Sequence, residues 1–85
     1  MNEELLEVFL KEDCDQHTQS VLLTAIRAKG GTAAVEDFTF NRFNVRLDFS
    51  ADEAVIDDDL NPADGECRLT LTSFSERVAA VVAAT

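Results

Sequence analysis

The chain has 85 residues, enough for one domain with one modest hydrophobic core, and its 46% hydrophobic and 28% charged residues exclude wholesale disorder. Seventeen Asp and Glu residues outnumber seven Lys and Arg residues, which gives a formal net charge of −10. Nucleic acids and anionic membranes repel such a chain, so we expect neither as a direct partner.

The first thirty residues are predicted to be helical. Side chains recurring every three or four residues form a stripe that should face a core. The stripe comprises Leu6, Leu10, Cys14, His17, Val21 and Ala25, widened by Leu5, Phe9, Leu22 and Ile26. Asn2 is expected to cap the N-terminus, and Gly30-Gly31 to end the segment. Asp13 or Asp15 could cap a second helix, which favours a break near residues 11–16 but leaves open one helix or two short ones.

After the glycines, the hydrophobic pattern changes to the alternation of β-strands. Three strands are predicted, over Phe43–Phe49, Ala54–Asp57 and Cys67–Thr72. Phe38 and Phe40 also alternate, but on the opposite parity, and a bulge or tight turn near Asn41-Arg42 would reconcile them with the strand that follows. The segment Asn61–Gly65 has the composition of a loop.

A C-terminal helix is predicted from one apolar stripe, formed by Phe74, Val78, Val81 and Val82. Ser73 followed by Glu76 has the pattern of a capping box at its start. The order of elements predicts a single α+β domain over residues 1–85, with an N-terminal helix (or two short helices), a three-stranded antiparallel meander and a C-terminal helix. The helices should pack on one face of the sheet and leave the other face exposed.

Candidate metal ligands and catalytic groups are few. Cys14 and His17 have a spacing found in zinc sites, but only Cys67 could add a soft ligand. Segment 57–66 fails the register of a calcium-binding loop, and only an irregular, weak calcium site is left open. His17 and Ser20 could touch on a helix, yet nothing indicates an oxyanion hole. We therefore expect no enzyme, no cofactor and no metal, and two buried thiols rather than a disulfide.

The clearest feature of the sequence is a run of acidic residues that contains no Lys or Arg. Its eight members are Asp48, Asp52, Glu53, Asp57, Asp58, Asp59, Asp64 and Glu66. They follow the first predicted hairpin, the second strand and the loop to the third strand, so we expect them along one exposed side of the sheet. Their mutual repulsion would be relieved by a cationic partner, which their field would steer to the surface. A purely solubilising role, as in a salt-adapted protein, is the alternative.

The layout resembles small acidic inhibitor proteins of bacteria and phages. The resemblance lies in the order of elements and in two stretches, an aliphatic strand and an acid-rich strand over Phe43–Asp59, and a strand leading to Phe over Cys67–Phe74. Such proteins include immunity proteins that neutralise toxic nucleases and anti-CRISPR proteins that occupy nucleic-acid channels. The resemblance implies stoichiometric blocking, in which carboxylates take the place of the phosphates that a basic site normally holds.

The sequence therefore predicts a non-catalytic acidic protein that binds and inhibits a basic, nucleic-acid-handling protein. We expect it in the cytoplasm, because the chain shows neither a secretory signal nor an apolar run long enough to span a membrane. The alternative is a small acidic adaptor or chaperone-like protein that acts as a homodimer through Val78, Val81 and Val82.

Overall fold

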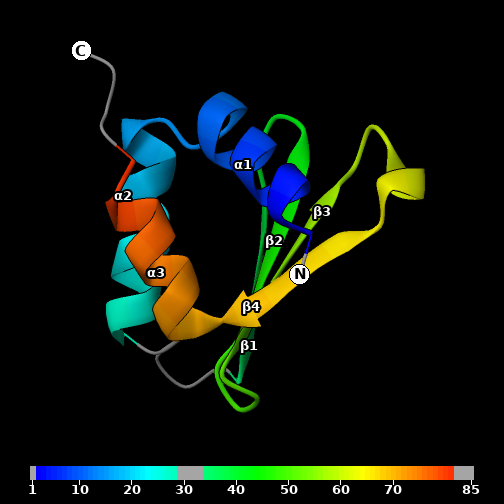
Figure 1. Cartoon of the computed structure of the whole chain (residues 1–85). Helices are drawn as coiled ribbons and strands as arrows, with labels where there is room; N and C mark the ends of the chain where they lie inside the picture. The colour runs from blue at the N-terminus through cyan, green and yellow to red at the C-terminus, as the bar shows by residue number, and fades with distance from the viewer. Residues whose placement is uncertain (1, 29–33, 82–85) are drawn as a thin grey trace.

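The computed structural model describes residues 2–28 and 34–81. Its elements are α1 (Glu3–Glu12), α2 (Gln16–Ala28), β1 (Val35–Thr39), β2 (Phe43–Asp48), β3 (Glu53–Asp58), the 3-10 helix η1 (Pro62–Asp64), β4 (Glu66–Thr70) and α3 (Leu71–Ala79). The strands form one antiparallel meander in the order β1-β2-β3-β4, and α1, α2 and α3 lie on one side of it (Figure 1). The predicted α+β class is confirmed, but the sheet has four strands where the sequence predicted three.

The N-terminal helical segment is divided into two helices, as the interpretation of a break favoured. The side chain of Asn2 accepts a hydrogen bond from Leu5 N at 3.2 Å, so Asn2 is the predicted N-cap of α1. Asp15 Oδ1 accepts one from Thr18 N at 2.8 Å and satisfies a free N–H in the first turn of α2. The predicted stop at Gly30-Gly31 lies outside the described residues.

The strand that the sequence missed is β1, which forms a hairpin with β2. The chain reverses at residues 40–42, and Phe40 N donates a hydrogen bond of 2.9 Å to Phe43 O. Even-numbered residues of β1 and odd-numbered residues of β2 therefore share the face toward the helices. The tight turn predicted near Asn41-Arg42, which reconciles the even-numbered Phe38 and Phe40 with the odd-numbered apolar residues of β2, is thus confirmed. β1 itself was not predicted because only Phe38 among its inward residues is apolar, whereas Glu36 interrupts the pattern.

The last helix, α3, begins at Leu71, which the sequence assigned to a strand. The Thr70 side chain accepts a hydrogen bond from Ser73 N at 3.1 Å, so Thr70 is the N-cap and the capping box predicted at Ser73 is wrong. Leu71 is buried as the first residue of the helix. It would also be buried as the next inward residue of the strand, so alternation alone could not show where the strand ended.

The core lies between the sheet and the three helices. The Phe9 ring of α1 packs against Phe40, Phe43 and Phe74, with ring centroids 6.3, 5.6 and 6.2 Å away. This aromatic cluster joins α1 to the β1–β2 hairpin and to α3. The other buried hydrophobic residues are Leu5, Leu6, Cys14, Leu22, Val45, Leu47, Ala54, Ile56, Cys67, Leu71 and Val78.

The C-terminal helix packs against α2, beside which it lies in Figure 1. Gln19 Nε2 donates hydrogen bonds of 2.9 Å to the carbonyl oxygens of Val78, in the last turn of α3, and Val81, just after the helix. Val78 is fully buried and Val81 packs partly buried against the core, so both serve the interior of the chain. The dimer interface expected at these residues is therefore wrong for Val78, and Val82 lies outside the described residues.

Replacing Phe9 with Ala tests the aromatic cluster. Because the ring is fully buried among three others, Phe9→Ala should lower the free energy of unfolding by about 3–5 kcal/mol. Urea denaturation followed by circular dichroism measures this. Leu60 is 75% exposed, and Leu60→Ala should change the free energy by no more than about 0.5 kcal/mol. Equal losses in the two variants would contradict the central place of Phe9.

Candidate protein-interaction surface

The side of the sheet away from the helices, the outer face, presents three rows of side chains set by the antiparallel register. The rows are Val35, Asp48, Glu53 and Thr70; Asp37, Arg46, Val55 and Arg68; and Thr39, Asn44, Asp57 and Glu66. Five carboxylates stand against two guanidinium groups, which gives the outer face a net charge of −3. Negative charge is therefore gathered on a surface that no described helix covers (Figure 1).

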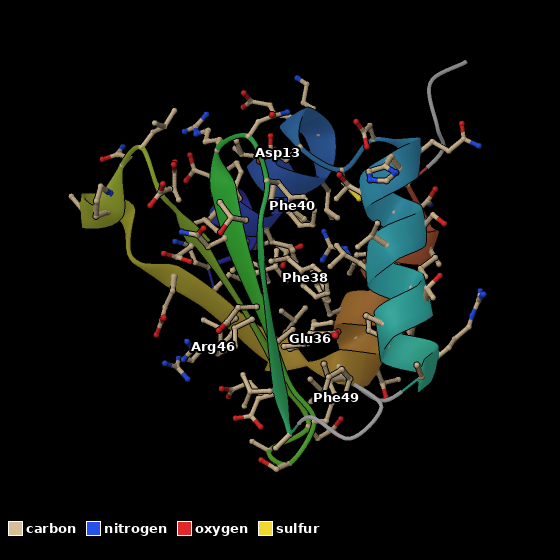
Figure 2. The ribbon with its side chains drawn as sticks, turned by 180° about the vertical axis from the view of Figure 1, so that it is seen from behind. Asp13, Glu36, Phe38, Phe40, Arg46 and Phe49 are labelled. Atoms are coloured by element: carbon tan, nitrogen blue, oxygen red, sulfur yellow. The ribbon has the colours of Figure 1, made fainter. Side chains whose placement is uncertain are left out.

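The outer face is hollowed rather than flat. An open depression of about 490 Å³ extends across it and is lined by residues of all three rows. Figure 2 shows Arg46 pointing to this side, away from the helices. Small-molecule sites are generally concave, largely apolar clefts that bury most of their ligand. A broad and strongly charged hollow suits a macromolecular partner better.

Both arginines of the outer face are paired with its carboxylates. Arg46 Nε lies 2.7 Å from Asp37 Oδ1, and the bond lowers the pKa of Asp37 from its ordinary value. Arg68 lies between two partners, with Nη1 2.8 Å from Glu53 Oε1 and Nε 2.6 Å from Glu66 Oε1. Exposed pairs of this kind contribute little to stability. Their effect here is to place both cations in the central row, between two rows that carry carboxylates.

The eight acids predicted to share one surface are partly gathered there. The members that lie on the outer face are Asp48, Glu53, Asp57 and Glu66. Asp52 and Asp59 are exposed next to the two ends of β3. Asp59 accepts a hydrogen bond from Asn44 of the outer face, whereas Asp52 lines a hollow beside α3, on the helix side of the sheet. The side chain of Asp64 lies outside the described residues.

Asp48 also has a structural role. Its Oδ1 accepts hydrogen bonds from Ser50 Oγ at 2.7 Å, Ala51 N at 3.0 Å and Ser50 N at 3.1 Å. The Ser50 side chain, followed by Ala51 N, lowers the pKa of Asp48 and keeps it charged. The carboxylate therefore holds the turn between β2 and β3. Replacing Asp48 would disturb this turn as well as remove a surface charge.

Asp58 contradicts the expectation that it lies on the exposed surface. The residue is 2% exposed, because position 58 has the parity of the inward residues Ala54 and Ile56. Its Oδ2 accepts hydrogen bonds from Arg42 Nη2 at 2.7 Å and Arg42 Nε at 3.0 Å. These bonds are the main reason that the pKa of Asp58 lies below its ordinary value of 3.8. Asp58 thus anchors an internal ion pair and is removed from the candidate surface.

Asp37 is the residue of the outer face that sequence reasoning missed. It belongs to β1, which was not predicted as a strand. The signal that could have placed it was the alternation of Phe38 and Phe40, because a residue beside an inward-facing one must point to the opposite side. The pairing of Asp37 with Arg46 then follows from the register of the hairpin, in which the two are cross-strand partners.

The residues considered for metal binding or catalysis are separated by the fold. Cys14 is buried, whereas His17 is exposed on α2, so the prediction that His17 faces the core is wrong. Ser20 is exposed on the same helix. Within the described residues, no three His, Cys, Asp or Glu side chains are grouped in a way that could hold a metal ion.

Both cysteines are buried free thiols, as the sequence indicated. Burial raises the pKa of Cys14 to about 11, with smaller contributions from the charges of Asp15 and Asp13. Burial also raises the pKa of Cys67. A thiol is reactive as the thiolate, so both groups should be chemically inert in the folded protein.

Comparison of the chain with protein-family models, curated proteins and solved structures gives no match. None of the described helices is both long and apolar enough to cross a membrane. The functional argument therefore rests on the geometry and charge of the surface itself.

The pair of neighbours Asp57 and Asp58 provides a matched test of the two faces of β3. Asp58→Asn should lower stability more than Asp57→Asn, because only Asp58 is buried against Arg42. The depressed pKa of Asp58 means that its stabilising effect is complete above about pH 4 and is lost as the pH falls through its folded pKa. The difference in melting temperature between wild type and Asp58→Asn should therefore shrink in acid. Equal melting temperatures for both variants at neutral pH would contradict the internal pair.

Alkylation tests the environment of Cys14. At about pH 8, the thiolate fraction of a thiol with a pKa of about 11 is roughly 100-fold below that of one at 9.0. Iodoacetamide should therefore label Cys14 at least about 100-fold more slowly in the folded than in the urea-unfolded chain. Mass spectrometry of the digested protein separates Cys14 from Cys67. Similar rates in both states would show that the site is open.

Proposed function

We propose that the protein is a non-catalytic acidic binding protein that blocks a basic, nucleic-acid-handling partner through its outer face. The observation that carries this proposal is the net charge of −3 on an exposed, hollowed sheet surface formed by all four strands. An immunity or anti-defence role in the cytoplasm is the biological setting that we propose for it.

The arrangement of charge on the outer face suits a lysine- or arginine-rich site. Its two acidic rows flank a central row in which each guanidinium is already paired. A cationic partner would thus meet carboxylates in both flanking rows. Arg46 and Arg68 would not repel it as unpaired cations, because each is already bonded to a carboxylate of the outer face. The exposed Asp59, which is bonded to Asn44 of the outer face, extends the same charge past the end of β3. Such complementarity speeds association and rejects acidic or neutral competitors.

The size of the molecule is compatible with this mode of binding. A typical stable interface buries about 800 Å² on each partner. The described chain has an accessible surface of 5154 Å², so such an interface would take about a sixth of it. One face of the sheet with the adjoining turns can supply this share. Blocking then requires only that the partner's basic site be covered, in the place where nucleic acid phosphates would otherwise sit.

A partner-binding surface and a merely solubilising charge differ in what they require of position. A solubilising role depends on total charge, whereas binding depends on where the charge lies. Glu4 and Glu7 are exposed on α1, on the helix side of the sheet, and carry the same charge as Asp57 and Asp59. Reversal of either pair changes the net charge of the chain equally.

Paired charge reversals provide the test. We expect Asp57→Lys with Asp59→Lys to weaken binding to a synthetic Lys- and Arg-rich peptide about tenfold or more, measured by isothermal titration calorimetry at about 50 mM salt. Glu4→Lys with Glu7→Lys should weaken it less than about threefold. Affinity of the wild type should fall at about 300 mM salt. Equal losses for the two double variants would reduce the charge to a solubilising role and remove the proposal.

A further inference from the structure

An open groove separates α2 from the edge strand β1, on the helix side of the sheet. The groove has a volume of about 560 Å³. The residues that line it include Val21, Thr24 and Ala25 of α2 and Glu36 and Phe38 of β1. Figure 2 shows Glu36 and Phe38 pointing from the sheet toward α2. Phe38 is the aromatic residue of its lining, and the Phe38 ring stacks on that of Phe40 with centroids 6.1 Å apart and planes inclined by 2°.

β1, which supplies Glu36 and Phe38 to this groove, also has one backbone edge turned away from β2. β1 pairs with β2 on one side and is the first strand of the sheet. The bonds from Phe40 N to Phe43 O and from Phe49 N to Ala34 O show that even-numbered residues direct their backbone groups to β2. In an antiparallel pair the intervening residues direct theirs the other way. The N–H and C=O groups of Val35, Asp37 and Thr39 therefore point to the outer edge.

On its helix side, the groove is lined by apolar residues of α2 that the core does not fully bury. Val21 and Ala25 belong to the stripe that the sequence assigned to the core, yet both are only partly buried, whereas Leu22 on the adjacent side of α2 is fully buried. Thr24 and Ala28 beside them are small and exposed. Small side chains on the helix leave room between α2 and β1. Strand addition needs such a groove beside an edge strand, where backbone bonds give affinity and side-chain pockets give specificity.

We propose that the β1–α2 groove binds an extended segment of a partner protein, which joins the sheet as a strand beside β1. The segment alternates apolar residues with Lys or Arg. The proposal deepens the proposed function by naming the part of the basic partner that docks. It rests on the proposed function in one respect, the positive charge of the partner. The groove would be occupied in this way even if the outer face contacts nothing.

Charge selects this occupant over a second copy of the chain. In an antiparallel β1–β1 pair around a two-fold axis, opposed residues have the same parity, so an axis at Glu36 or Asp37 sets a carboxylate against its own copy. Two chains of −10 would also repel each other as wholes. An inward-pointing charge on an edge strand is a known defence against such pairing. A basic residue on an incoming strand would instead neutralise Glu36.

The test uses a short, end-blocked peptide of alternating Val and Lys residues, titrated into the isotope-labelled full chain and followed by amide NMR. We expect the shifts to concentrate on β1 and on the groove side of α2. The same peptide with alternate backbone nitrogens methylated cannot complete the ladder and should bind at least about tenfold more weakly. A peptide with Glu in place of Lys should not bind.

Variants of Asp37 isolate the backbone contribution. Asp37→Pro and Asp37→Ala both lose the ion pair with Arg46, but only the proline also removes the outward backbone N–H. An edge strand tolerates a proline at such a position. Asp37→Pro should weaken peptide binding at least about tenfold relative to Asp37→Ala. Glu36→Gln should weaken binding of the Val-Lys peptide, because it removes the carboxylate that a lysine of the added strand would neutralise.

The outcomes separate the two proposals. Shifts confined to the outer face, with both Asp37 variants binding alike, would overturn strand addition and leave the proposed function standing. Shifts on β1 that survive reversal of Asp57 and Asp59 would support strand addition even if the outer face fails. Absence of shifts on β1, or a dimer in sedimentation that Asp37→Pro dissolves, would overturn the inference.

Discussion

The carboxylate of Asp13 holds the β1–β2 turn against the end of α1, and the character of both sheet faces depends on it. Asp13 Oδ2 accepts hydrogen bonds of 2.9 Å from the backbone nitrogens of Arg42 and Phe43. Asp13 is 5% exposed, and a carboxylate so deeply buried is tolerated only when it is hydrogen-bonded. The turn fixed there sets the register of β1. A slip by one residue would move Phe38 outward and Asp37 into the core.

Arg42 extends this anchor to a third element. Its guanidinium contacts Asp58 at the end of β3 and lies 3.3 Å from Glu12 at the end of α1, and it also rests over the Phe43 ring at 5.1 Å. Negative charge in this protein is therefore divided between two tasks. Asp13 and Asp58 hold the hairpin from inside. The carboxylates of the outer face lie at the surface instead, where Asp37, Glu53 and Glu66 pair with arginines of the same face. The net charge of −10 alone does not distinguish the two tasks.

Several features that depend on residues close together in the sequence were predicted correctly. The caps at Asn2 and Asp15 and the alternation of β2 and β3 could all be read from neighbouring residues. The inward position of Asp58 was also readable, since it continues the row of Ala54 and Ile56, but a carboxylate there is stable only with Arg42, which is distant in sequence. β1 was not recognised because its inward Glu36 breaks the apolar pattern and leaves the alternation of Phe38 and Phe40 as the one local signal. Its place in the sheet comes from the partner strand and the turn.

The two candidate surfaces meet at β1. Glu36 and Asp37 are consecutive residues of the edge strand, so their side chains point to opposite sides of the sheet, one into the groove and one onto the outer face. A strand added at this edge would contribute alternate side chains to both surfaces at once. Basic residues on either side of that strand would find acceptors, whereas an acidic strand would be repelled on both. A single extended basic segment could thus be selected by the groove and by the outer face together.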